Sequence, residues 1–407
     1  MTKLKTFFRR LFAGSFKRMF GYIGTIHKET GKNRFIMFFD MIWCIFRYSV
    51  GYMDYRVFGF ANIKGRNRRT FMTMNDNITI SKRCNDRTYF HIFDNKSEFD
   101  EAFREYIGRD FLNLEKATAD DLREFCKGRE TVFAKPVNQF GGEGITKETV
   151  TPDTDYEALY KRLCGNKQYL VEETIKQNEQ MDRLSPSSIN TIRMVTLLHE
   201  GKVHFMYALV RMSNGTNCVD NICSGGMYVS IGADGVIHKN AYCDATGVYY
   251  EEHPFTHTRF NGFEIPMFCE AVEMCKKAAL VVPQVGYIGW DVAITPTRPV
   301  LVEGNTLPSY DMCQNYGHID NKTGVKPDLL RFSVKNISSN FTADIKQAAN
   351  VLCVHRLFYY IYSASLTNFS SDAFTALLFP VSAFSSQPIT ELLYSLCSIS
   401  RKLYLQR

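Results

Sequence analysis

Two apolar segments, GYIGWDVAIT and PVLVEGN, restrict the possible folds of this chain more than any other part of the sequence. Both are rich in β-branched and aromatic residues, and only the short turn Pro296–Pro299 separates them, which predicts a buried β-hairpin. Polar side chains interrupt these segments at Asp291, Glu303 and Asn305. An acid in such a strand is costly to bury unless a cation or a hydrogen-bonding partner accompanies it. We therefore expect this hairpin to hold a cation or an ion pair.

The spacing of these three side chains favours a magnesium site. Glu303 and Asn305 are two residues apart on one strand, so their side chains point to the same face, and Asp291 can face them across the hairpin. Magnesium binds through a few carboxylate or amide oxygens together with the phosphates of a substrate. An ion pair between one of the acids and a nearby arginine is the alternative, and the sequence leaves both open.

A second feature is a lysine at the end of an apolar strand, TVFAKP, which the glycine-rich segment NQFGGEG follows. Gly141, Gly142 and Gly144 let backbone N–H groups approach phosphates, and the Lys135 ammonium supplies a positive charge, so the pattern suits a triphosphate. It is not a P-loop, because the lysine precedes the glycines. A plain β-hairpin produces the same pattern, so this segment alone does not decide the matter.

The strand QYLVEE ends in two acids, Glu172 and Glu173, and the chain continues to Ile175. An adenine ring needs an apolar slot with backbone hydrogen bonds to its edge, and a carboxylate can hold the ribose hydroxyls. The segment therefore predicts the adenosine end of a nucleotide site. An ordinary strand end with two solvated acids is the alternative.

Two arginines lie in other apolar strands. Arg193, in SINTIRMV, can clamp a transferred phosphoryl group through two oriented hydrogen bonds. Arg211 and the segment 220–226 can complete the substrate side of the same site. A buried arginine–carboxylate pair is the competing explanation for both arginines.

The first 70 residues carry the positive charge of the chain. They contain 15 Lys and Arg against 3 Asp and Glu, whereas the whole chain has a net charge of +7. Basic residues interleaved with Phe, Leu, Met and Tyr suit a helix at a membrane surface, so peripheral membrane contact through residues 1–60 is one interpretation. A helical extension packed on the main domain, with a solvated basic face, is the other. Nucleic-acid binding is not expected, because no known module is present.

The cysteines and the N-terminus predict a cytoplasmic protein. Twelve cysteines are scattered without a CxxC pair, which argues against a disulfide framework and a clustered zinc site. Lys and Arg interrupt every apolar run in the first twenty residues, so no signal peptide is expected. If the basic segment binds a membrane, the expected location is its inner face.

The order of the expected elements is that of an α+β protein with two lobes. A strand and turn are expected over residues 71–80, helices beginning at Ser97 and Thr118, and a long helix over residues 267–281. The predicted domains are a basic segment (1–70), a first lobe with the glycine loop (71–171), a second lobe with the metal site (172–325) and an apolar tail without an assigned role (326–407).

Taken in order, the motifs resemble the ATP-grasp superfamily: a strand lysine, a glycine loop, V-E-E-x-I, N-T-x-R and D…E-x-N. The segments YIGRDFL, SINTIRMVTL, DNICSGGMYVSIG and GYIGWDVAIT look most like the sugar-transfer-associated ATP-grasp group of polysaccharide biosynthesis. The resemblance covers residues 55–320. It implies a two-lobed ATP-grasp fold, which here has a basic helical extension at its N-terminus.

The resemblance also implies a role for each matching residue. Lys135 would contact the α- and β-phosphates of ATP, and Lys96, in FDNKSEF, would match the earlier phosphate-binding lysine of the superfamily. Glu172 and Glu173 would flank the adenosine, and Arg193 would face the transferred phosphoryl group. The implied magnesium ligands are Asp291, Glu303 and Asn305.

The implied activity is Mg·ATP-dependent ligation of a small-molecule carboxylate to an amine, or to a thiol, a hydroxyl or a sugar-linked acceptor, through an acyl phosphate. Closure of the glycine loop would exclude water from that intermediate. Two other functions use the same features. A phosphotransferase to a hydroxyl shares the ATP site, and a catalytically idle nucleotide-binding scaffold at the membrane fits the basic N-terminus and the apolar tail.

Overall fold

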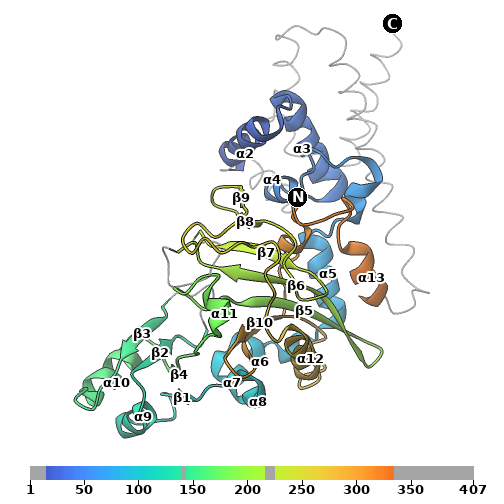
Figure 1. The fold of residues 1–407 in the computed structure, drawn as a ribbon. Coiled ribbons are helices and arrows are strands. Elements are labelled where there is room, and N and C mark those ends of the chain that lie inside the picture. The colour runs from blue at the N-terminus through green and yellow to red at the C-terminus, as the bar shows by residue number, and fades with distance from the viewer. Residues whose placement is uncertain (1–14, 139–143, 216–224, 334–407) are drawn as a thin grey trace, which may run out of the picture. The chain divides into compact units, whose positions relative to one another are not determined.

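The computed structural model describes residues 15–138, 144–215 and 225–333 (Figure 1). The strands in these ranges form two antiparallel sheets, one of four strands and one of seven. Helices pack on both sheets, and within the described residues a series of helical segments precedes the first strand. The protein is therefore α+β with a helical N-terminal region, as the sequence predicts.

The smaller sheet has the strand order β1-β4-β2-β3. Its strands are β1 (Phe111–Asn113), β2 (Thr131–Lys135), β3 (Thr146–Thr149) and β4 (Leu170–Glu173). Helices α9 (Ala119–Cys126) and α10 (Tyr156–Gly165) contribute Leu122 and Leu159 to a core with Val132 and Val171 of the sheet. The alternation of buried and half-buried residues along β2 leaves Lys135 on the face opposite Val132.

The larger sheet has the strand order β11-β10-β5-β6-β7-β8-β9. Its strands are β5 (Ile192–His199), β6 (Lys202–Met212), β7 (Met227–Ile231), β8 (Ala241–Cys243), β9 (Val248–Tyr250), β10 (Tyr287–Ile294) and β11 (Pro299–Asn305). Every residue of β10 is buried, since β10 lies between β5 and β11 and both faces of the sheet are covered. The hairpin expected from the sequence is the pair β10–β11.

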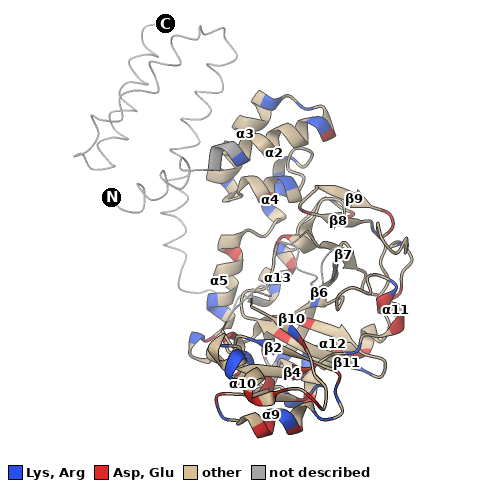
Figure 2. Ribbon diagram, turned by 90° about the vertical axis from the view of Figure 1, so that its left-hand side faces the viewer, with Lys and Arg blue, Asp and Glu red and all other residues tan. Residues whose placement is uncertain are grey.

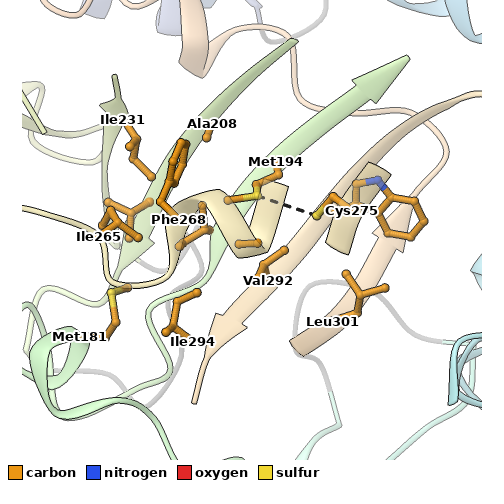
Figure 3. Close-up of a cluster of buried hydrophobic side chains, with 14 of the residues drawn as sticks. Met181, Met194, Ala208, Ile231, Ile265, Phe268, Cys275, Val292, Ile294 and Leu301 are labelled. Carbon is orange, nitrogen blue, oxygen red and sulfur yellow. Dashed lines mark hydrogen bonds between the residues drawn. The ribbon is translucent and has the colours of Figure 1, made fainter. Parts of the chain in front are cut away.

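Helix α12 (Phe268–Ala278) covers one face of the larger sheet (Figure 3). Its buried side chains Phe268, Ala271, Cys275 and Ala278 recur every three or four residues and so form one apolar stripe. The Cys275 thiol lies 3.8 Å from the sulfur of Met194 on β5. This core supports the strands that carry the polar residues of the hairpin.

One helix occupies a segment where a strand is predicted. The sequence pattern predicts a strand and turn over residues 71–80, but helix α5 (Met74–Cys84) lies there, so this prediction is wrong. The Thr73 hydroxyl accepts a hydrogen bond from the Asp76 backbone N–H, and the Asp76 carboxylate accepts one from the Thr73 N–H. This reciprocal capping box fits the helix, and Ile80 is buried beneath it.

Short helical segments lead from α5 to the smaller sheet. They are the 3-10 turn η2 (Arg87–Tyr89), α6 (His91–Asp94), α7 (Lys96–Ala102) and α8 (Arg104–Ile107). Helix α7 begins one residue before Ser97, because the side chain of Asn95 accepts hydrogen bonds from two backbone N–H groups and caps it. This start places Lys96 at the first residue of the helix. By contrast, Thr118 caps α9 as expected.

The N-terminal region forms helices α2 (Ser15–Thr30), α3 (Arg34–Tyr48) and α4 (Tyr52–Val57), followed by the 3-10 turn η1 (Gly65–Thr70). One cluster of buried side chains joins Ile23 of α2 and Met41 of α3 to Leu197 and Tyr287 of the larger sheet. The interpretation as a packed helical extension therefore describes residues 15–57. Membrane contact through residues 1–60 stays a prediction. Among the described residues, no helix combines the length and the apolar character that a bilayer span needs.

The remaining elements are α11 (Glu179–Asp182), the 3-10 turn η4 (Met312–Gln314) and α13 (Lys326–Ser333). Most of the predicted apolar tail, from residue 334 onwards, lies outside the described residues. Figure 2 shows that basic and acidic residues are interspersed over the helices of both sheets. The charge of these helices is therefore mixed rather than of a single sign.

Candidate active site

The hairpin β10–β11 and its neighbour β5 bring three predicted site residues into one row. The strand register places Asp291 opposite Glu303 of β11 on one side and opposite Arg193 of β5 on the other. Side chains of directly paired residues lie on the same face of a sheet. The backbone pairing alone therefore gathers two predicted metal ligands and the predicted phosphoryl-binding arginine.

Two guanidinium groups hold Asp291. Arg193 donates from Nε to Oδ1 at 2.5 Å and from Nη2 to Oδ2 at 3.1 Å, and Arg211 of β6 donates from Nη2 to Oδ2 at 2.7 Å. Burial by itself raises the pKa of Asp291, but the two arginines reverse that effect and the net shift is downward. Asp291 is thus ionised at neutral pH. The ion pair that the sequence offers as an alternative to a metal site is present.

Glu303 has a different electrostatic environment. The side-chain nitrogen of Asn305 lies 3.4 Å from Glu303 Oε1, so both side chains share one face of β11, as predicted. Burial, and then the neighbouring charge of Asp291, raise the pKa of Glu303 to about 7. The hairpin therefore pairs a permanently ionised carboxylate with one that holds a proton close to neutral pH.

This raised pKa predicts how stability depends on pH. Between its ordinary pKa near 4.5 and about 7, Glu303 keeps a proton in the folded chain that it loses in the unfolded chain. The free energy of unfolding should therefore fall as the pH rises through this window, by up to about 1.4 kcal/mol per pH unit from this group. Glu303→Gln should remove that part of the slope. Urea unfolding of the nucleotide-free chain at pH 5, 6 and 7 measures it.

Glu101, which is exposed on α7, supplies the control. Glu101→Gln should leave the pH slope of the wild-type chain nearly unchanged, because its side chain is exposed and its ion pair with Arg104 lies at the surface, where such pairs contribute little. Equal slopes for wild type and Glu303→Gln would contradict the assignment of a raised pKa to Glu303.

The donor atoms of the hairpin fit Mg²⁺. Asp291 and Glu303 offer carboxylate oxygens and Asn305 offers an amide oxygen, which are the hard ligands that this ion prefers. A divalent cation also offsets the repulsion that raises the pKa of Glu303. Within the described residues no group of three or more His, Cys, Asp or Glu could hold a metal ion. A magnesium ion at this hairpin therefore needs Asn305 and phosphate oxygens among its ligands.

A second charged cluster lies on the smaller sheet. Glu172 of β4 forms ion pairs with Lys135 of β2 and, at 3.0 Å, with Arg109, which also lies 2.9 Å from Asp100 of α7. Burial raises the pKa of Glu172, but Arg109 and Lys135 lower it, and the net shift is downward. Glu172 is 3% exposed. It is therefore an internal anchor for Lys135 and not a solvated acid at a strand end.

Arg109 is a central residue that the sequence pattern does not single out. Its Nη1 donates to the backbone oxygen of Leu301 on β11 at 2.7 Å, so it connects the cluster of the smaller sheet to the hairpin. The segment YIGRDFL contains it, but nothing in the local pattern distinguishes a buried arginine there from a solvated one. The same holds for Asp100, its second partner.

Lys96 lies between the hairpin and the cluster of the smaller sheet. Its backbone N–H donates to the Val137 carbonyl at 3.0 Å, just beyond the end of β2. Burial lowers the pKa of Lys96, and the positive charge of Lys135 lowers it further. The negative charge of Glu303 raises this pKa, but the net shift is downward. Glu303 and Lys135 are thus both near enough to Lys96 to influence its pKa.

The two acids of β4 point in opposite directions. The carboxylate of Glu172 faces Lys135, whereas Oε2 of Glu173 accepts a hydrogen bond from the Asp110 backbone N–H at 3.2 Å. Residues next to each other on a strand lie on opposite faces, so the two carboxylates cannot line the same face of one site. Ile175 follows the strand and is half-buried. The roles of all three at the adenosine remain predictions.

Only the end of the glycine loop falls within the described residues. Gly144 has a φ of +71°, a left-handed conformation that glycine adopts without a steric penalty. Its carbonyl accepts a hydrogen bond from the side chain of Gln168 at 2.9 Å, which ties the end of the loop to the sheet. Gly141, Gly142 and residues 220–224 lie outside the described residues.

Comparison with known proteins identifies the family to which the chain belongs. The model of the family described as "Sugar-transfer associated ATP-grasp" matches residues 75–333. No curated protein matches the chain.

Several solved structures are similar to the chain. The ATP-grasp ligase PsnB, in complex with a precursor peptide and AMPPNP, is 12% identical with a TM-score of 0.35, and the match covers 61% of this chain and 62% of that chain. D-Alanine-D-alanine ligase from Helicobacter pylori is 10% identical with a TM-score of 0.35, over 61% and 60%. N5-carboxyaminoimidazole synthase from Aspergillus clavatus, in complex with ADP and a ribonucleotide, is 12% identical with a TM-score of 0.36, over 65% and 58%. The chain thus spans less than two thirds of each of these proteins.

Proposed function

Because the chain belongs to the sugar-transfer associated ATP-grasp family, we propose that it uses Mg·ATP to ligate a carboxylate to an amine. The acyl phosphate formed from the carboxylate is the intermediate, and the biological context is the synthesis or modification of a cell-surface polysaccharide. One observation carries the proposal. Charged groups from a helix and both sheets converge on one region although they are far apart in the sequence: Lys96 of α7, Lys135 of β2 and Glu303 of the β10–β11 hairpin.

Two lysines bind the phosphates in this proposal. Lys135 sits at the end of β2 directly before the glycine loop, and its ion pair with Glu172 fixes the direction of its side chain. Lys96 comes from the first turn of α7, and the charge of Glu303 reaches its ammonium group. Two cations close to each other suit a polyphosphate, because each oriented charge offsets part of the negative charge on its oxygens.

The arginines act on the transferred phosphoryl group. Arg193 has three polar contacts: two with Asp291 and one with the Ser309 hydroxyl, which lies 3.2 Å from Nη1. Its planar fork is thus oriented before any ligand arrives. When a phosphoryl group is bound, Arg193 exchanges one contact with Asp291 for a phosphate oxygen, while Arg211 continues to hold the carboxylate. The guanidinium then stabilises the charge on the phosphoryl oxygens during transfer.

The oxygens of Asp291, Glu303 and Asn305 would hold magnesium. The ion supplies charge neutralisation on the phosphate oxygens. Glu303 has to give up its proton for this role, and its pKa of about 7 makes that loss inexpensive at neutral pH. The proton and the metal therefore compete for the same carboxylate, which matches the chemistry of the site to neutral or weakly basic pH.

Thermal unfolding with Mg·ADP tests the nucleotide site. At a hundredfold excess of ligand over its dissociation constant, the folded chain should gain about 2.7 kcal/mol of stability, seen as a raised midpoint of unfolding. Lys135→Ala should lose most of that gain, because the phosphates lose one oriented cation. The same measurement without nucleotide reports any effect of the substitution on stability itself.

Lys161→Ala is the matched control. Lys161 is exposed on α10 and pairs only loosely with Glu157, at 3.7 Å, so Mg·ADP should stabilise this variant as it does the wild type. Absence of any midpoint shift in the wild-type chain would overturn the proposed function. If Mg·ADP raises the unfolding midpoint of Lys135→Ala and Lys161→Ala by the same amount, Lys135 does not contribute to nucleotide binding.

A further inference from the structure

A cavity of about 420 Å³ lies between the N-terminal helices and the larger sheet. Tyr22 of α2, Asp54 of α4 and Asn77 of α5 line it on one side, and Asp244, which follows β8, lines it on the other. Helix α4 and strands β8 and β9 lie side by side in both views of the fold (Figures 1 and 2). The volume is in the range of small-molecule sites.

The wall of this cavity is continuous with the proposed reaction centre. The chain leaves β11 at Asn305 and runs directly along the cavity as residues 307–311. Within that segment Ser309 contacts Arg193 Nη1 at 3.2 Å, and Pro308 packs against Gly289 of β10, where a Cβ atom would come within 3.0 Å of it. A molecule in the cavity is therefore separated from the phosphoryl-binding arginine by one side chain.

Three carboxylates face the cavity, from Asp54, Asp244 and Asp311. Tyr310 donates to Asp54 at 3.0 Å, but no described residue donates a hydrogen bond to the Asp244 side chain. Burial, and then Asp311, raise the pKa of Asp54 and of Asp244 to about 6. The positive charge near these three carboxylates is therefore too small to compensate their burial and mutual repulsion.

The arginine of the cavity lining, Arg56, offsets the charge of Asp244 only in part, and the net shift of the Asp244 pKa stays upward. Arg56 lies 3.2 Å from the carboxylate of Glu29, and its guanidinium is 5.5 Å from the ring centre of Tyr22. It also lies against Gly247, where a Cβ atom would collide with it. Its position is thus fixed by α2 and by the turn before β9, and its charge is shared with Glu29. A ligand with a positive charge would complete the electrostatic balance of the cavity.

We infer that this cavity is the acceptor subsite of the proposed ligase, and that Asp54, Asp244 and Asp311 hold the ammonium group of a primary amine substrate. The inference rests on the proposed function, and it names the class of the second substrate. It also assigns a role to the N-terminal extension, because Tyr22 and Asp54 belong to helices α2 and α4. The extension thus forms part of the site and is not merely attached to the ATP-grasp domain.

The carboxylates of this cavity can accept the proton that the proposed amide-forming reaction releases from the ammonium group. The bound ammonium gives a proton to one of the carboxylates, which leaves a neutral amine with a free electron pair. The nitrogen then forms a bond to the acyl carbon, the bond between that carbon and the phosphate oxygen breaks, and inorganic phosphate leaves with the electron pair. The second proton that the nitrogen has to lose passes to the departing phosphate. A carboxylate whose pKa burial raises to about 6 is a better proton acceptor than a solvated one.

Thiol labelling tests the charge preference of the cavity and does not require the substrate to be identified. Leu307, which is 44% exposed at the cavity, is replaced in the full chain by Leu307→Cys. The rates of reaction with methanethiosulfonate ethylammonium and with its ethylsulfonate analogue are compared after subtraction of labelling in the unmodified chain. Leu280→Cys, at an exposed position outside the cavity lining, gives the reference ratio.

The ratio of cationic to anionic labelling should be at least about tenfold higher for Leu307→Cys than for Leu280→Cys. It should return to the reference value when Leu307→Cys is combined with Asp54→Asn and Asp244→Asn. A ratio equal to the reference in the first comparison, or unchanged by the two asparagines, overturns the inference.

Mg·ADP stabilisation of the same variants separates the two proposals. If Mg·ADP stabilises these variants but the cavity shows no preference for the cationic reagent, the proposed nucleotide site stands and the proposed amine subsite is wrong. If Mg·ADP does not stabilise the chain, both the proposed function and the amine subsite that rests on it are wrong.

Discussion

Replacing Arg109 by leucine is expected to lower the free energy of unfolding by about 3–5 kcal/mol. The guanidinium is buried, and it compensates two carboxylates that are buried as well, those of Asp100 and Glu172. Leucine leaves both acids without this partner and removes the hydrogen bond to the Leu301 carbonyl. Breaking a buried ion pair costs much more than losing a surface pair, because the remaining charge stays desolvated.

Urea unfolding, followed by circular dichroism, measures this effect. Arg87→Leu is the control, since Arg87 is exposed in the turn η2 and its substitution should change stability by no more than about 0.5 kcal/mol. Adding Glu172→Gln to Arg109→Leu should recover part of the loss, because the buried charge that Arg109 compensated is then gone. If Arg109→Leu and Arg87→Leu unfold at the same urea concentration, Arg109 does not stabilise the junction between the smaller sheet and the hairpin.

Arg193→Lys is expected to reduce the rate of ADP release about 10²–10³-fold while Mg·ADP still binds. Lysine keeps the positive charge, but it cannot make the forked contacts that Arg193 makes with Asp291 and Ser309 at the same time. In the proposed mechanism the substitution removes the oriented donor from the phosphoryl group during transfer, whereas the proposed phosphate-binding residues Lys96 and Lys135 are unchanged. Initial rates at saturating Mg·ATP, with the acid and amine found in a substrate screen, measure the loss.

The exposed Arg183 provides the matched substitution. Arg183→Lys should release ADP at the wild-type rate, and both variants should show the Mg·ADP-dependent rise in the unfolding midpoint. A rate for Arg193→Lys within about threefold of the wild type would remove this arginine from the transfer step. Loss of Mg·ADP stabilisation in Arg193→Lys would instead mean that the arginine acts in nucleotide binding.

Several features of the fold follow from local sequence. The hairpin β10–β11 is predictable because two continuous apolar runs of strand length are separated by one proline-containing turn. The common face of Glu303 and Asn305 follows from the two-residue period of a strand. Helix α9 follows from the capping box at Thr118, whereas the same pattern at Thr73 is obscured because the residues after it are β-branched or polar. The order of these motifs is enough to place the chain in its family.

The contacts of the site are not local and could not be read in this way. Arg109 is 192 residues from the carbonyl that it contacts on β11, and Asp54 is 256 residues from the hydroxyl of Tyr310. Whether an acid pairs with an arginine or with a cation depends on which strand lies next to it. The order β10-β5-β6 places both Arg193 and Arg211 beside Asp291.

The sequence by itself thus determined the hairpin β10–β11, helix α9, the family and most of the residues with suitable chemistry, because period, capping and motif order act over a few residues. Only the tertiary structure decided which charges meet, which of them are buried, and that the N-terminal helices close a cavity beside the hairpin. The physical reason is that desolvation and Coulomb interactions depend on distance in space. The separation of two residues along the chain does not give this spatial distance, which is set only when the two sheets have formed.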